Sequence, residues 1–93
     1  DVKYCDRILS LIEKHSAEIS EIIDNKSMAF PETRIFPADK SILFIAVAEI
    51  LYCDDVPDKV AVSEAANIAS RYSSEKSASF ISGILSSVIA GKG

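Results

Sequence analysis

The side chains best suited to acid–base, nucleophilic or metal chemistry are few in this chain: one histidine and two cysteines. His15 lies on the apolar seam of a helical segment, which is typical of a packed core residue, and no second histidine exists to share a metal. Cys5 and Cys53 form neither a CxxC motif nor a metal-ligand spacing. No glycine-rich phosphate loop precedes a helix. We therefore expect no enzyme, no catalytic residue, no metal and no cofactor.

Composition limits the class of partner. The 93 residues carry a formal net charge of −4, which argues against non-specific binding to nucleic acid, so an RNA site would have to be a local patch. Two cysteines without a signal peptide are typical of a reduced, cytoplasmic protein. The longest apolar run, Ile42 to Cys53, is too short to cross a membrane. The length fits one domain, residues 1–93.

The elements that must position any site are helical, and they predict an all-α bundle of about four main helices. The first segment, from Val2 to Asp24, has apolar residues in steps of three and four. Its pattern has already begun at residue 2 and residue 1 is not Met, so we interpret the chain as a piece of a longer or processed protein. A connection with a helical turn near residues 31–34 follows.

A second helix begins near Asp39 and is apolar from residue 42 to residue 53 except at Glu49. A helix that is apolar all round must be covered on all sides, so we expect it at the centre of the bundle. A buried carboxylate needs compensation, so we expect a helix N-terminus or a basic side chain beside Glu49.

Two further helices complete the expected bundle. The third begins at Val56-Pro57, because proline suits the first turn of a helix, and it runs to Tyr72. Ser74 is placed to cap the fourth. The inward face of the third helix is expected to comprise Ala61, Ala65, Ile68, Ala69 and Tyr72, and that of the fourth Phe80, Ile81, Ile84, Leu85 and Val88.

Two motifs at these helix starts carry a family resemblance. One is Asp54-Asp55-Val56-Pro57 followed by Lys59-Val60-Ala61-Val62 and Glu64-Ala65, and the other is Glu75-Lys76-Ser77 followed by Phe80-Ile81-Ser82-Gly83-Ile84-Leu85. In this order and spacing they resemble the C-terminal part of the NusB family of bacterial transcription antitermination factors. They resemble less closely the RNA-binding domain of ribosomal RNA cytosine methyltransferases.

The resemblance implies a NusB-like helical fold and a set of partners. Family members bind the boxA element of ribosomal RNA operon transcripts together with ribosomal protein S10, within an antitermination complex on RNA polymerase. Matched by position, Lys59, Lys76 and Phe80 are expected at or near RNA, and Asp39 and Tyr72 at the protein partner. Lysines in the first turn of a helix suit this role, because free N–H groups there already favour phosphate. Phe80 also belongs to the apolar stripe, and core packing is an equally good interpretation.

Departures from the family pattern leave three hypotheses open. Family members begin with two more helices, the first of which carries an arginine cluster, and this chain has Phe44 where relatives usually have arginine. The chain alone is therefore expected to bind RNA weakly or not at all. The alternatives to an antitermination factor are the methyltransferase domain and a helical protein-interaction module without RNA binding. Without those helices, the central helix should leave an exposed apolar patch that favours self-association.

Overall fold

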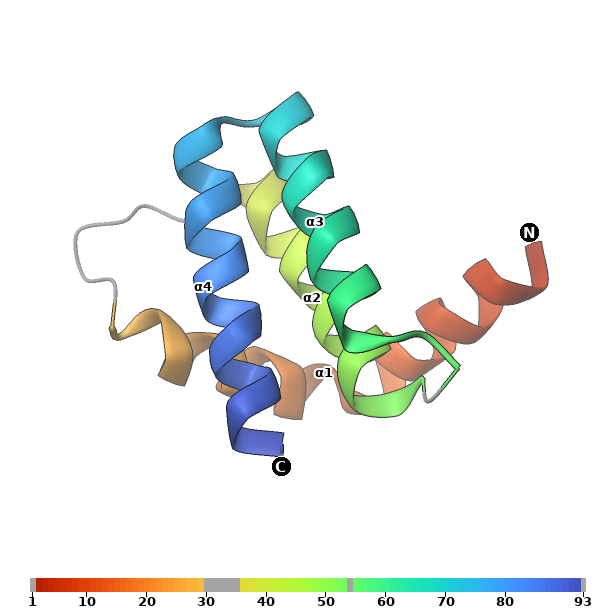
Figure 1. Cartoon of the computed structure of the whole chain (residues 1–93). Coiled ribbons are helices and arrows are strands. Elements are labelled where there is room, and N and C mark those ends of the chain that lie inside the picture. Colours follow the sequence, from red (N-terminus) through yellow and green to blue (C-terminus); the bar gives the residue numbers. More distant parts are fainter. Residues whose placement is uncertain (1, 30–35, 54, 93) are drawn as a thin grey trace.

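Helices make up most of the chain in a computed structural model, which describes residues 2–29, 36–53 and 55–92. They are α1 (Val2–Ser27), α2 (Pro37–Tyr52), α3 (Asp58–Tyr72) and α4 (Glu75–Lys92). The prediction of an all-α bundle of about four helices is therefore confirmed. In Figure 1, α3 and α4 form an antiparallel hairpin alongside α2, and α1 crosses one end of this group. The turn predicted near residues 31–34 lies outside the described residues.

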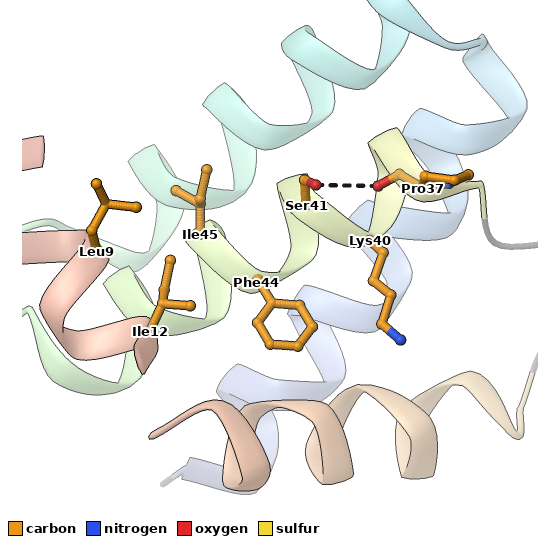
Figure 2. A pocket seen from close by; sticks show the side chains of 7 residues that line it. All are labelled: Leu9, Ile12, Pro37, Lys40, Ser41, Phe44 and Ile45. Carbon is orange, nitrogen blue, oxygen red and sulfur yellow. Dashed lines mark hydrogen bonds between the residues drawn. The ribbon is translucent and has the colours of Figure 1, made fainter. Parts of the chain in front are cut away.

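α2 contacts each of the other three helices, as α4 also does, so these two helices together form the centre of the bundle. α2 begins at Pro37, earlier than the predicted Asp39, because the fixed φ of proline suits a first helical position. Its buried side chains include Leu43, Val47 and Ile50, and Glu49 is also buried. The neighbouring helices leave one face of α2 uncovered, as the prediction of an exposed apolar patch implies. There Ile45 is 46% exposed beside a hollow between α1 and α2 (Figure 2).

Of the two helices of the hairpin, α3 packs into the core through small residues and α4 through large ones. α3 buries only Ala61, Ala65 and Ala69, which recur every fourth residue and allow the two backbones to approach closely. Ile68 is 45% exposed and Tyr72 is 74% exposed, so both were wrongly placed on the inward face. The reason is that α3 contacts only α2 and α4, so its buried stripe is narrow. All five predicted apolar positions of α4 are buried, and they join Ile19 and Ile23 of α1 in the core.

α1 bends at His15, whose backbone leaves the helical range (φ −113°, ψ 17°). The His15 ring stacks on Tyr52 at the end of α2, with ring centroids 4.0 Å apart and planes at 12°. The Tyr52 hydroxyl donates to Glu18 Oε2 at 2.8 Å. Further towards the N-terminus, Arg7 forms an ion pair with Asp55 at 3.0 Å, and its hydrogen bond lowers the pKa of that carboxyl. These contacts hold α1 on both sides of the bend against the end of α2 and the loop that follows.

The Tyr52–Glu18 contact should make stability depend on pH in alkaline solution. Burial, followed by the hydrogen bond to Glu18 and its charge, raises the pKa of Tyr52 to about 12 from 10.0. A tyrosine with a raised folded pKa stabilises the fold fully below its unfolded pKa, and this contribution is lost as pH rises from about 10 to about 12. Tyr52→Phe should cost about 1 kcal/mol at neutral pH and should abolish this loss. Urea unfolding of both proteins across that range checks the prediction, which fails if their stability difference does not change with pH.

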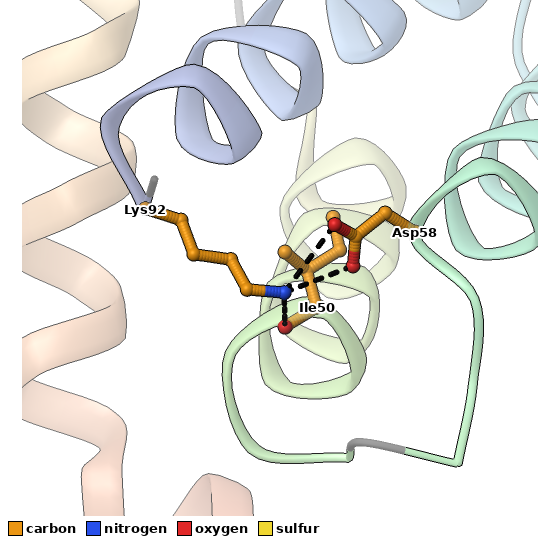
Figure 3. A network of polar contacts seen from close by, with 3 residues as sticks. All are labelled: Ile50, Asp58 and Lys92. Carbon is orange, nitrogen blue, oxygen red and sulfur yellow. Dashed lines mark hydrogen bonds and ion pairs between the residues drawn. The ribbon is translucent and has the colours of Figure 1, made fainter.

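Lys92 joins three helix ends: those of α2 and α4 and the start of α3. Its Nζ donates to the Ile50 carbonyl oxygen at 2.8 Å and to the Asp58 carboxylate at 3.0 and 3.3 Å (Figure 3). Ile50 lies in the last turn of α2, where a cation satisfies carbonyl groups that have no intrahelical partner. Asp58 begins α3, where a carboxylate favours the positive end of the helix. The contact therefore closes the bundle where α2 and α4 end and α3 begins.

Candidate nucleic-acid interface

The two lysines predicted to contact RNA are both exposed, and each is the second residue of its helix: Lys59 in α3 and Lys76 in α4. Their side chains are therefore available to a ligand beside first-turn N–H groups. Because α3 and α4 are antiparallel, however, these starts lie at opposite ends of the hairpin (Figure 1). The 15 residues of α3 span about 22 Å. The structure thus provides two separate cationic positions and does not bring the two lysines together.

Two helix N-termini meet at the end that carries Lys76. The first turn of α2 contributes Asp39, and the first turn of α4 contributes Ser77, whose hydroxyl donates to Asp39 Oδ2 at 3.0 Å. The predicted cap is present, because Ser74 Oγ accepts the Ser77 backbone N–H at 3.0 Å. We call this region the α2–α4 corner and define it as Asp39 together with residues 73–77. It holds a rigid, capped helix start next to an exposed lysine.

Of the other predicted site residues, Phe80 and Asp39 are buried and Tyr72 is exposed. Phe80 is 4% exposed, so its ring lies in the core, in agreement with the packing interpretation. Asp39 is 1% exposed, which places its carboxylate inside the corner. Neither side chain is presented to a ligand in this structure. Tyr72 is 74% exposed in the last turn of α3, immediately before the corner, where its ring is free to meet a partner.

Two basic residues at the same end of the bundle were not singled out from the sequence. Lys40 is exposed in the first turn of α2, and Arg71 is exposed in the last turn of α3. The first turns of α2 and α4 and the last turn of α3 lie at one end of the bundle (Figure 1). Lys40, Arg71 and Lys76 therefore share that end with Tyr72, although Glu75 offsets part of the charge. The sequence signal that could have identified Lys40 is Pro37, because it marks a helix start three residues earlier. Arg71 had no such signal, because only the antiparallel packing of α3 and α4 brings it to this end.

The hollow beside α2 is apolar. Leu9 and Ile12 of α1 face Phe44 and Ile45 of α2 across a volume of about 470 Å³, with Lys40 at one edge (Figure 2). Among the described residues that line it, Ser41 contributes a hydroxyl, which donates to the Pro37 carbonyl oxygen at 3.2 Å. Leu9 is 60% exposed, so the predicted exposed apolar patch is present. Self-association through this patch stays a prediction.

Residues 2–29, 36–53 and 55–92 contain neither a metal-binding cluster nor a membrane-spanning helix. Within these ranges, no group of three or more histidine, cysteine or acidic side chains is arranged to hold a metal ion. No helix in the same ranges has the length and apolar character needed to cross a membrane. Of the predicted site residues, the described surface exposes Lys59, Lys76 and Tyr72, and exposed acidic side chains such as Glu64 and Glu75 lie on the same two helices.

Comparison with known proteins agrees with the motifs at the helix starts. The family model for the NusB family matches residues 1–90. The transcription antitermination protein NusB of Finegoldia magna is 43% identical over 89 residues, covering 96% of this chain and 65% of that protein. The protein of the same name from Bifidobacterium animalis subsp. lactis is 39% identical over 90 residues, covering 97% of this chain and 58% of that protein.

The chain thus spans roughly three fifths of the length of these relatives, which are named as antitermination proteins and not as enzymes. No solved structure matches the fold significantly. The match over residues 1–90 and the identity to these relatives lead to one conclusion: this chain belongs to the NusB family.

Proposed function

We propose that this chain is the greater part of a transcription antitermination factor that binds the boxA element of ribosomal RNA operon transcripts together with ribosomal protein S10. It would act in the cytoplasm, within an antitermination complex on RNA polymerase, and residues 1–93 would work as one helical domain. The observation that carries the proposal is the family match over residues 1–90, with relatives named as transcription antitermination proteins. The exposed cations at helix starts support it, because such positions favour phosphate.

The geometry supports different roles for the predicted residues. Lys76 and Lys59 are exposed at helix starts and would each contact a phosphate of the RNA. Tyr72 is exposed next to the α2–α4 corner and would contact the protein partner. Phe80 and Asp39 are buried and would act by holding α4 and α2 in place. The apolar hollow between α1 and α2 takes no part in RNA binding in this proposal, because phosphate has no affinity for an apolar lining.

A helical module that binds only protein is a second candidate, and the net charge of −4 favours it. The direct test is a titration of the full-length protein with boxA RNA and with a scrambled RNA of equal length, at matched salt, with and without S10. The antitermination proposal expects a preference for boxA that increases when S10 is present. Binding of S10 with no preference for boxA would reject it in favour of the protein-only module.

A further inference from the structure

Asp39 has an unusual place for a carboxylate, in the interior where the starts of α2 and α4 meet. It is 1% exposed, and Ser77, itself 6% exposed, donates its hydroxyl to Asp39 Oδ2 at 3.0 Å. Burying a carboxylate is costly unless donors and positive charge compensate for the loss of water. Both helix N-termini provide partial positive charge at this point, because Asp39 lies in the first turn of α2 and Ser77 in that of α4. The carboxylate thus stabilises the contact between two helix starts.

A chain of hydroxyl groups connects this carboxylate to the turn between α3 and α4. Ser73 Oγ lies 3.0 Å from Ser77 Oγ, and Ser74 Oγ donates to Ser77 Oγ at 3.2 Å. A hydroxyl has one proton, and Ser77 uses its proton on Asp39, so Ser77 accepts from both neighbours. All three hydroxyl protons therefore run towards Asp39. Hydrogen bonds in such chains strengthen one another, which fixes residues 73–77 against α2.

We propose that Asp39 is a positioning residue for Lys76: through Ser77, it holds the first turn of α4 in the orientation that presents the Lys76 ammonium group to an RNA phosphate. Lys76 directly precedes Ser77 and is exposed, so the network that fixes Ser77 also fixes the backbone of Lys76. The role of Lys76 rests on the proposed function, whereas the anchoring of the turn does not.

The charge of Asp39 is central to this role. Its Oδ1 is buried and has no hydrogen-bond partner within the described part of the chain. The attraction between the carboxylate and the two helix starts therefore supplements the single hydrogen bond from Ser77. Asp39→Asn keeps the shape and removes this charge, while Ser77→Ala keeps the charge and removes the donor. The two variants separate the two contributions, and Ser77→Ala is a milder change if Asp39→Asn fails to fold.

The anchoring is tested without RNA, by amide hydrogen exchange on the full chain. The Ser77 and Ala78 amides bond to Ser74 Oγ and to the Ser74 carbonyl oxygen, both at 3.0 Å. In Asp39→Asn and Ser77→Ala these amides should exchange about tenfold faster, with amides inside α3 unchanged. Exposed matched controls, Asp24→Asn and Ser70→Ala, should leave the rates at wild-type values. Unchanged exchange at both amides in both variants would overturn the proposal whether or not the protein binds RNA.

The effect on Lys76 is tested by combining variants of the full-length protein in an RNA titration over a range of salt concentrations. Lys76→Ala should lower the slope of log affinity against log salt by about 0.7 in the wild-type and Ser70→Ala backgrounds. In the Ser77→Ala background it should change the slope by close to zero, since the lysine is no longer held in place. An equal effect in all backgrounds would show a merely structural role for Ser77 and Asp39 and would refute positioning. If the full-length wild-type protein binds no RNA, the proposed function fails, and the exchange rates alone decide whether Asp39 anchors the turn.

Discussion

Leu43→Ala is expected to lower the free energy of unfolding by about 2–5 kcal/mol, whereas Ile45→Ala should change it by less than about 1 kcal/mol. The two residues lie on the same apolar helix, but Leu43 is fully buried and Ile45 is 46% exposed. Truncation at Leu43 removes buried apolar area and leaves a cavity between α2 and its neighbours, while truncation at Ile45 shortens a side chain that already meets water. Because the total free energy of unfolding of a small domain is only about 5–15 kcal/mol, the loss at Leu43 is a large fraction of it.

Urea unfolding of the two variants and the wild type measures the difference directly. For a domain of this size the loss at Leu43 corresponds to a fall of roughly 10–30 °C in the midpoint of thermal unfolding. Ile45→Ala is the matched control, because it removes an aliphatic side chain of the same size from the same helix. Similar losses for both variants would mean that another chain or another copy covers the Ile45 face in solution.

The double variant Lys59→Ala, Lys76→Ala is expected to lower the salt slope of RNA binding by about 1.4, or about 0.7 for each lysine. The effects should add, since the 15 residues of α3 keep the two positions about 22 Å apart. Each lysine would neutralise one phosphate, so the loss should be similar for every RNA sequence and greatest at low salt. Fluorescence anisotropy at several salt concentrations gives the slope for each variant.

Lys14→Ala provides the control, because Lys14 is an exposed lysine in the middle of α1 and not in the first turn of a helix. Its removal changes the net charge by the same amount as either test variant, so it separates local contact from overall charge. An unchanged slope for one of the test lysines would remove that residue from the interface. Losses equal to that of Lys14→Ala would point to a general effect of net charge.

Local signals in the sequence were sufficient to place the helices. Ser74 caps the start of α4 as predicted, because its hydroxyl accepts a first-turn N–H, and Asp39 indicated the start of α2 to within two residues of Pro37. The spacing of Phe80, Ile84 and Val88 likewise indicated which face of α4 is buried. The end of α1 was less certain, since the helix continues to Ser27 through polar residues that carry no periodic signal.

The candidate site was predicted only in part. The exposure of Lys59 and Lys76 follows from their polar positions at helix starts. The exposure of Tyr72 could not be predicted, because an aromatic residue in phase with buried alanines is usually packed. The burial of Asp39 could not be predicted either, because a carboxylate in a first turn normally faces water. Whether Tyr72 and Asp39 are covered depends on whether a neighbouring helix extends far enough to pack against them.

By itself, the sequence determined the helical elements, the Ser74 cap of α4, the small number of cations available for RNA and the family to which the chain belongs. These depend on backbone preferences and periodicity, which act within a few turns of one helix. Tertiary structure decided that Lys59 and Lys76 lie at opposite ends of a hairpin and that Asp39 joins two helix starts. The positions of these residues relative to one another depend on the direction in which the helices pack and on which helix faces meet. Residues far apart in the chain jointly determine that packing, so no local pattern reveals it.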